Sequence, residues 1–289
     1  MMMKKMFLSL ISLGILFTSC NDEDQPTTSN LTLNLSGLEA LGPNFVYEGW
    51  IIVNNQPIST GRFSSVTFPQ TFLVNAGQLA NASMFVLTIE PTVDADPGPA
   101  ATKLLSGNFS GSLANVNSDV MVANFSNATG KYILATPTDT NDTNEESGVW
   151  FLDNSSGSPV TGLNLPTLAA GWKYEGWVVL GGQVLSTGTF LDASMADDNA
   201  ATSVFKGTAN NGPNYPGEDF LRNAPSGLTF PTDLRGTTIV ISVEPSPDNS
   251  SDPFTLKPLA HQVPANAMGH TAITMGNGPV VSLSGTVSR

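Results

Sequence analysis

Two pairs of glutamates are the residues whose type and setting could carry chemistry in this 289-residue chain. Glu48 and Glu90 lie in apolar segments of the first half, and Glu175 and Glu244 lie in matching segments of the second half. Glycoside hydrolysis uses two carboxyl groups about 5 to 9 Å apart across a sugar. A carboxylate inside an apolar strand must otherwise be solvated or bonded, because an unpaired buried charge is costly. We therefore expect four structural carboxylates, and a binding role stays open for Glu48 and Glu175.

A lysine follows the second glutamate of each pair at the same distance. Lys103 comes thirteen residues after Glu90, and Lys257 comes thirteen residues after Glu244. This spacing can bring lysine and glutamate together across a hairpin. It predicts either an ion pair or a carboxylate that is bonded to the backbone.

The other usual anchors of catalysis are missing from the sequence. It has no GxSxG elbow, no P-loop and no GxGxxG after a strand. Its two histidines, His261 and His270, are nine residues apart, which fits no helical metal motif. The acidic loop 139–146 offers oxygen ligands for Ca²⁺ but lacks the glycine of an EF-hand turn, so a solvated hairpin tip is favoured. We expect a protein without enzymatic activity, without a metal site and without a cofactor.

The densest remaining group of acidic and aromatic residues lies in a segment that only the second half contains, at about 191–237. Its candidate ligand-binding residues are Asp197, Asp198, Tyr215, Glu218, Asp219 and Phe220. Long loops on a β scaffold often carry function, and acids beside aromatic rings suit carbohydrate or peptide contact. The same composition equally suits a loop that Tyr215 and Phe220 hold to its own domain.

A repeated sequence places all these residues in the chain. YEGW occurs at 47–50 and at 174–177, and Ser-Thr-Gly-x-Phe follows each copy at the same offset of 127. An apolar segment that ends in Glu-Pro, with its later lysine, repeats at an offset of 154. The shared structural motif consists of Tyr47, Glu48, Trp50, Glu90 and Lys103 in the first copy and Tyr174, Glu175, Trp177, Glu244 and Lys257 in the second. We predict an internal duplication, with repeats at 31–127 and 128–289.

The local patterns predict strands rather than helices. Aromatic and β-branched runs at 46–53 and 173–180 end in Asn-Asn and Gly-Gly, which are hairpin-turn dipeptides. The 27 glycines, 20 prolines and only 12% charged residues favour many short strands. The predicted fold is all-β, with two tandem antiparallel β-sandwich domains. A further hairpin, at 131–135 and 148–153, lies between the copies and could belong to either.

The combination of Tyr-Glu-Gly-Trp, a turn, Ser-Thr-Gly-x-Phe and a later Glu-Pro strand resembles the extracytoplasmic C-terminal domain of the anti-sigma-K factor family. The resemblance covers 45–63 with 84–105, and 172–190 with 238–259. It implies a small β-sandwich without enzymatic activity on the outer side of a membrane. This chain lacks the family's cytoplasmic and transmembrane parts, so we expect no direct contact with a sigma factor.

The N-terminus predicts export and lipidation. Residues 1–19 have the basic start and apolar run of a signal peptide, and residues 16–20 resemble a lipobox that ends in Cys20, the only cysteine. Residues 20–30 read as a lipidated cysteine and flexible tether. The acidic residues 21–24 resemble a surface-export tag, and they suit an ordinary solvated linker equally well. We expect an outer-membrane lipoprotein, on the periplasmic or the surface side, that acts as a binding or sensing module on an envelope protein or a glycan. The alternative is a glycan-directed surface protein, adhesin or hydrolase, that uses the 191–237 segment. The formal net charge of −13 argues against nucleic acid.

Overall fold

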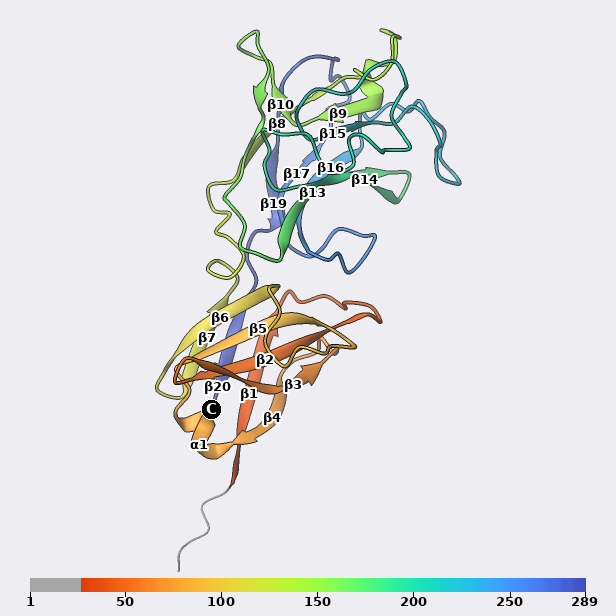
Figure 1. Cartoon of the computed structure of the whole chain (residues 1–289). Coiled ribbons are helices and arrows are strands. Elements are labelled where there is room, and N and C mark those ends of the chain that lie inside the picture. Colours follow the sequence, from red (N-terminus) through yellow and green to blue (C-terminus); the bar gives the residue numbers. More distant parts are fainter. Residues whose placement is uncertain (1–26) are drawn as a thin grey trace, which may run out of the picture.

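The computed structural model describes residues 27–289 as an all-β protein of antiparallel sheets with one short helix (Figure 1). The predicted signal peptide and Cys20 lie outside the described residues. The first strand, β1 (Thr28–Ser36), already includes the end of the predicted tether. Residues 28–30 are strand because their backbone pairs with 73–75 of β4. Among residues 27–289, no helix is long and apolar enough to cross a membrane.

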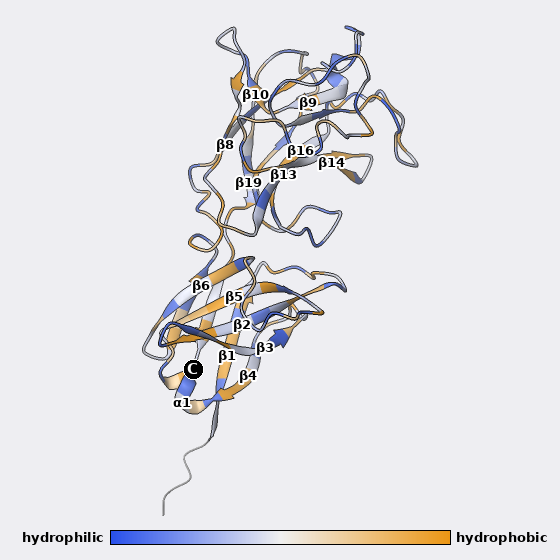
Figure 2. Cartoon of the chain, in the orientation of Figure 1, coloured by the Kyte–Doolittle hydropathy of each residue, from blue (hydrophilic) through white to orange (hydrophobic). Residues whose placement is uncertain are grey.

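The N-terminal unit, residues 28–117 with 284–288, is built on one eight-stranded sheet of order β3-β2-β5-β6-β7-β20-β1-β4. Its other elements are β2 (Phe45–Val53), β3 (Gln56–Phe63), β4 (Gln70–Asn75), α1 (Ala76–Ala80), β5 (Met84–Pro91), β6 (Lys103–Ser110), β7 (Leu113–Asn117) and β20 (Ser284–Ser288). Hydrophobic residues recur along β1, β5 and β6 (Figure 2). Their buried side chains form the core of the unit.

The C-terminal unit, residues 129–280, contains a five-stranded sheet of order β14-β13-β16-β17-β19 and a second sheet of order β12-β8-β9-β15, with β18 on β8. The strands of the first sheet are β13 (Trp172–Leu180), β14 (Gln183–Phe190), β16 (Thr238–Pro245), β17 (Lys257–Gln262) and β19 (Gly276–Val280). The remaining elements are β8 (Thr129–Leu134), η1 (Glu145–Ser147), β9 (Gly148–Trp150), β10 (Leu152–Asp153), β11 (Val160–Thr161), β12 (Leu163–Asn164), β15 (Gly217–Asp219) and β18 (Ile273–Thr274). The hairpin between the repeats, β8–β9, therefore lies in the C-terminal unit.

The C-terminal strand β20 corrects the predicted range 128–289 for the second repeat. β20 lies between β7 and β1 of the N-terminal sheet, where it pairs with both along its whole length. Val287 is fully buried there. Without β20, the facing edges of β7 and β1 would each be left with unpaired backbone groups.

The two units repeat the same geometry around YEGW. The Tyr47 hydroxyl donates to the carbonyl of Glu39 at 2.8 Å, and the Tyr174 hydroxyl donates to the carbonyl of Pro166 at 2.5 Å. Each tyrosine lies eight residues after its acceptor and stacks on the phenylalanine of the paired strand at 5.5 Å. The paired strands also share a β-bulge after the glycine of the motif.

The hairpin arm that follows the motif needs a glycine beside the bulge, because its backbone there has a positive φ angle. Gly61 and Gly188 have φ angles of +125° and +111°, which side chains other than that of glycine rarely adopt. Each faces the motif glycine of the neighbouring strand.

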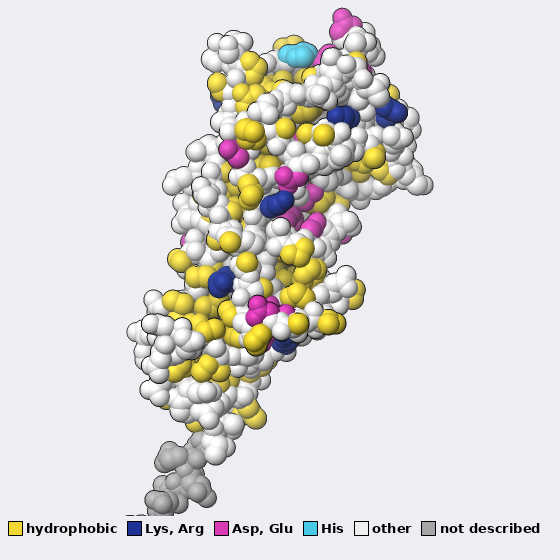
Figure 3. Space-filling model, viewed as in Figure 1, with side chains coloured by type: hydrophobic (Ala, Val, Ile, Leu, Met, Phe, Trp, Pro, Cys, Tyr) yellow, Lys and Arg dark blue, Asp and Glu magenta, His cyan; other side chains and the backbone are white. Residues whose placement is uncertain are grey.

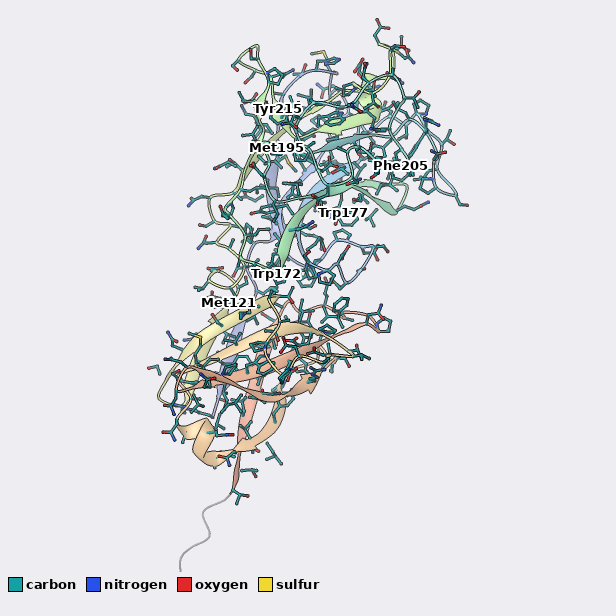
Figure 4. All side chains as sticks on the ribbon, in the orientation of Figure 1. Met121, Trp172, Trp177, Met195, Phe205 and Tyr215 are labelled. Atoms are coloured by element: carbon teal, nitrogen blue, oxygen red, sulfur yellow. The ribbon has the colours of Figure 1, made fainter. Side chains whose placement is uncertain are left out.

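The units are in direct contact. The indole of Trp172 donates to the carbonyl of Lys103 at 3.2 Å, and the Thr255 hydroxyl donates to the carbonyl of Gly37 at 2.9 Å. Trp172 lies where the two units meet (Figure 4). Buried side chains of both units belong to one continuous cluster.

Candidate functional site

In the N-terminal unit, Glu90 ends a chain of hydrogen bonds that begins at the YEGW tryptophan. The indole of Trp50 donates to the Thr88 hydroxyl at 2.9 Å, and this hydroxyl donates to the Glu90 carboxylate at 2.5 Å. The backbone N–H of Ala100 donates to the same carboxylate at 2.8 Å. The strand and the loop that follows it are thereby joined through one carboxyl group.

The C-terminal unit repeats this chain of bonds. The indole of Trp177 donates to the Ser242 hydroxyl at 2.7 Å, and Ser242 donates to the Glu244 carboxylate. The backbone N–H of Phe254 donates to Glu244 at 2.9 Å. Both Glu90 and Glu244 are only 1% exposed. The serine and the threonine stand at the same position of the repeat, so either hydroxyl can serve as the relay.

The lysines contact the loop rather than the carboxylates. The Lys103 ammonium donates to the carbonyl of Ala100 at 3.3 Å, and that of Lys257 donates to the carbonyl of Phe254 at 2.6 Å. Within the described part of the chain, no ion pair joins either lysine to Glu90 or Glu244. The predicted ion pair is therefore corrected. Backbone bonding, the other arrangement expected from the spacing, is the one observed.

We expect Ser242→Ala to lower the free energy of unfolding by about 2 to 3 kcal/mol, because it leaves both a buried indole N–H and a buried carboxyl oxygen without their shared partner. Ser242→Thr is the matched control, since threonine fills this position in the N-terminal unit. It should keep most of the stability. Urea unfolding of the three proteins measures the difference, and equal losses for alanine and threonine would contradict a hydroxyl relay.

The YEGW glutamates differ between the two units. Glu48 accepts from the Ser59 hydroxyl at 2.5 Å and from the Arg62 guanidinium at 2.6 Å. Glu175 accepts from the Ser186 hydroxyl with one oxygen, but its other oxygen, Oε2, is buried and has no hydrogen-bond partner. Burial raises the pKa of Glu175 to about 7.

The four glutamates do not form an open catalytic pair. All of them are at most 5% exposed, and each accepts hydrogen bonds from hydroxyl, backbone or guanidinium groups of its own unit. Glycoside hydrolysis needs two carboxyls that face a sugar-sized space. This arrangement instead suits a scaffold.

Three of the six acids of the 191–237 segment, Asp197, Glu218 and Asp219, are buried. Asp219 accepts from the backbone N–H of Thr138 at 2.9 Å and from the indole of Trp150 at 2.8 Å. Glu218 accepts from the Ser203 hydroxyl, and Asp197 accepts from the backbone N–H of Gly217 at 3.2 Å. Burial raises the pKa of Asp197 and of Asp219 to about 6, and that of Glu218 to about 7.

The aromatic residues of the segment also hold it in place. Phe220 is fully buried and packs against Phe205 and Phe230, with ring centroids 5.9 and 5.6 Å away. The Tyr215 hydroxyl donates to the carbonyl of Pro159 at 3.0 Å. Of the six candidate ligand-binding residues, Asp219 and Tyr215 therefore hold the segment to the rest of its unit, and Asp197, Glu218 and Phe220 hold the segment together.

Asp198 is the exposed member of that set. Its carboxylate accepts from the Lys173 ammonium at 2.7 Å and from the Thr189 hydroxyl at 2.7 Å. Its backbone N–H donates to the carbonyl of Thr189 at 2.8 Å. The start of the segment therefore lies along β14, close to the YEGW strand.

A groove of about 430 Å³ lies beside the start of the segment. It runs between residues 161–167, which include β12, and residues 191–194. Its polar side chains are Thr161, Asn164, Thr167, Asp192 and Ser194. The 161–167 wall gives little sequence signal because its strands are only two residues long.

Exposed apolar side chains lie in and next to the groove. Leu191, which lines it, is 65% exposed, and the neighbouring Met195 and Val160 are also exposed. Met195 and Tyr215 lie near each other on this part of the C-terminal unit (Figure 4). A concave surface that combines polar groups with exposed apolar side chains suits ligand binding.

Residues 27–289 contain no group of three or more His, Cys, Asp or Glu side chains that could hold a metal ion. The two histidines bond separately, His261 with the Tyr132 hydroxyl and His270 with Glu145. No family model, curated protein or solved structure matches this chain. Its function has to be inferred from its own geometry.

Proposed function

We propose that this chain is a non-enzymatic, lipid-anchored protein of the bacterial cell envelope that acts as a binding or sensing module. One observation carries the proposal: the repeated glutamates are enclosed by bonds to their own unit, whereas a groove is open beside the segment that only the C-terminal unit has. The N-terminal sequence supports the location, since Cys20 follows a lipobox-like run. A lipid at Cys20 would leave the tether and the N-terminal unit between the membrane and the groove.

We also infer that the two units are duplicated β-sandwich domains. The matched tyrosine-to-carbonyl bonds, bulges and tryptophan–hydroxyl–carboxylate relays support a common origin, because these contacts involve residues at constant sequence offsets. Similarity to the anti-sigma-K extracytoplasmic domain would then apply to both units. The β scaffold is then common to both units, and the 191–237 segment gives the C-terminal unit a surface that the N-terminal unit does not have.

A glycan is the second candidate for the ligand class. The groove favours it, since hydroxyl, amide and carboxylate side chains line one concave surface beside an exposed leucine. Such a set can bond sugar hydroxyls and cover the apolar face of a sugar ring.

We expect the purified protein to bind without turning over its ligand. Incubation with bacterial envelope polysaccharides, followed by retention and product analysis, measures both properties at once. Asn164→Ala with Asp192→Ala should remove glycan retention, whereas Asp233→Asn, an exposed change outside the groove lining, should not. Hydrolysis that disappears in Glu48→Gln or Glu175→Gln would overturn the proposal. Absence of glycan retention would remove the glycan candidate alone.

A further inference from the structure

The N-terminal unit contains a complete guanidinium site. Arg62 donates from Nε to Glu48 at 2.6 Å, from Nη2 to Asp94 at 2.9 Å and from Nη1 to the carbonyl of Pro91 at 3.4 Å. Three acceptors from two strands and a loop thus surround one planar cation. The arginine comes from β3, directly opposite Glu48.

The C-terminal unit keeps the acceptors and lacks the arginine. Glu175 stands at the position of Glu48, and Thr189 faces it across the β13–β14 pair where Arg62 faces Glu48. Pro245 ends β16 opposite the start of β13, as Pro91 ends β5 opposite the start of β2. Asp248 follows Pro245 by three residues, as Asp94 follows Pro91.

Without this cation, the C-terminal unit has an unsatisfied carboxyl oxygen at the same position. Glu175 is 5% exposed, and its Oε2 is buried without a hydrogen-bond partner, whereas the matching oxygen of Glu48 receives Arg62. Buried polar atoms are nearly always bonded, so an orphaned carboxyl oxygen at a conserved position of the repeat indicates an absent partner.

We propose that Glu175, Asp248 and the carbonyl of Pro245, together the Glu175 site, bind the guanidinium of an arginine side chain from a partner protein. Arginine fits better than lysine, because its planar fork can satisfy several acceptors at fixed angles, as Arg62 does in the other unit. The chain's net charge of −13 favours the approach of a basic partner. The inference rests on the proposed binding function and specifies that the partner protein presents an arginine side chain.

The groups around Glu175 allow such a ligand. From β13, Lys173 is paired with Asp198 rather than with Glu175. From β16, Glu244 is a buried carboxyl whose pKa is raised to about 8, so near neutral pH the negative charge comes from the exposed Asp248 in the loop after β16. Asp198 also accepts from the hydroxyl of Thr189, the residue that faces Glu175 across the β13–β14 pair. Acidic side chains gather beside a basic one near the middle of the molecule (Figure 3).

The binding step has a proton signature. Burial raises the pKa of Glu175 to about 7, and a guanidinium binds the ionised carboxylate. Binding should therefore release a proton near neutral pH and should strengthen as the pH rises through about 7.

The test is a calorimetric titration with N-acetyl-arginine amide, with N-acetyl-citrulline amide as the uncharged control of the same shape. We expect the arginine probe alone to bind, with an affinity that rises from about pH 6 to about pH 8. Thr189→Arg, which copies the N-terminal unit, should fill the site, raise the melting temperature and weaken probe binding at least about tenfold. Asp248→Asn, a change at an exposed position, should also weaken binding and serves if Thr189→Arg does not fold.

Three results would overturn the site: no binding of the arginine probe up to about 10 mM by the folded protein, equal binding of the citrulline probe, or undiminished binding by folded Asp248→Asn or Thr189→Arg. Glycan retention by the groove would be unaffected by these results. The two failures are therefore distinguishable. The probe titrations test the guanidinium site, whereas hydrolysis of a ligand by the purified protein would contradict the proposed binding function.

Discussion

Deletion of residues 284–289 is expected to abolish cooperative folding of the N-terminal unit. The deletion removes β20, so β7 and β1 lose the strand that pairs with both. It also removes the fully buried Val287 and the Arg289 guanidinium, which donates to the carbonyls of Leu79 and Ala82 at 2.6 and 2.7 Å. Loss of a central strand and its core side chain should cost more than about 5 kcal/mol, comparable to the total stability of many domains.

The matched control for the deletion is Ser284→Ala, which keeps the whole backbone of β20 and changes an exposed side chain. It should unfold like the parent protein. Amide hydrogen exchange separates the two units: protection should be lost throughout β1 and β7 of the truncated protein, while β13 and β16 should retain more of theirs. Full protection of β1 after the deletion would show that β20 is dispensable.

Stability should fall as the pH rises from about 5 to about 8. Burial raises the pKa of Glu244 from 4.5 to about 8 and those of Glu175 and Glu218 to about 7. A folded state with raised carboxyl pKa values binds more protons than the unfolded state between the two pKa values. Its advantage is therefore complete below the unfolded pKa and is lost as the pH rises through the folded pKa. At about 1.4 kcal/mol for each pH unit between about pH 5 and pH 8, Glu244 alone contributes on the order of 4 kcal/mol to this loss.

Urea midpoints measured between about pH 5 and pH 8 test this slope. Glu244→Gln should flatten it, because glutamine keeps the oxygen that accepts from Ser242 and Phe254 but does not titrate. Asp233→Asn is the control, since Asp233 is a half-exposed carboxylate whose pKa is lowered by Arg235, and its loss should leave the slope in place. A stability that rises with pH over this range would show that the buried carboxyls are ionised in the folded protein.

The difference between Arg62 and Thr189 connects the two proposals. The same strand geometry holds a paired carboxylate in one unit and an orphaned one in the other. The N-terminal unit is thereby internally complete at this position. The C-terminal unit is not, and it is also the unit with the groove.

The local sequence was sufficient to predict the hairpins around YEGW. The Asn-Asn and Gly-Gly turns adopt positive φ angles, and the strands before them lie within a residue of their predicted limits, 46–53 and 173–180. Such features depend on neighbours along the chain, which a sequence pattern records directly. The all-β class follows from the same signals.

The place of β20 could not be predicted in this way. This strand has only five residues, most of them polar and one a glycine, and its partner strand β1 lies about 250 residues earlier in the sequence. The segment becomes a strand because its backbone pairs with both β7 and β1 in the folded sheet. Its burial is decided by the sheet that it completes.

For the four glutamates, the sequence predicts some features and the tertiary structure decides the others. The sequence by itself determined that Glu48, Glu90, Glu175 and Glu244 form two equivalent pairs, because their spacing repeats. Only the tertiary structure decided that hydroxyl and backbone donors, rather than lysines, hold Glu90 and Glu244, and that Glu175 lacks the cation of its counterpart. The physical reason is that spacing specifies which residues share a strand face, whereas the donor at each carboxyl oxygen depends on which neighbouring strand or loop folds against it.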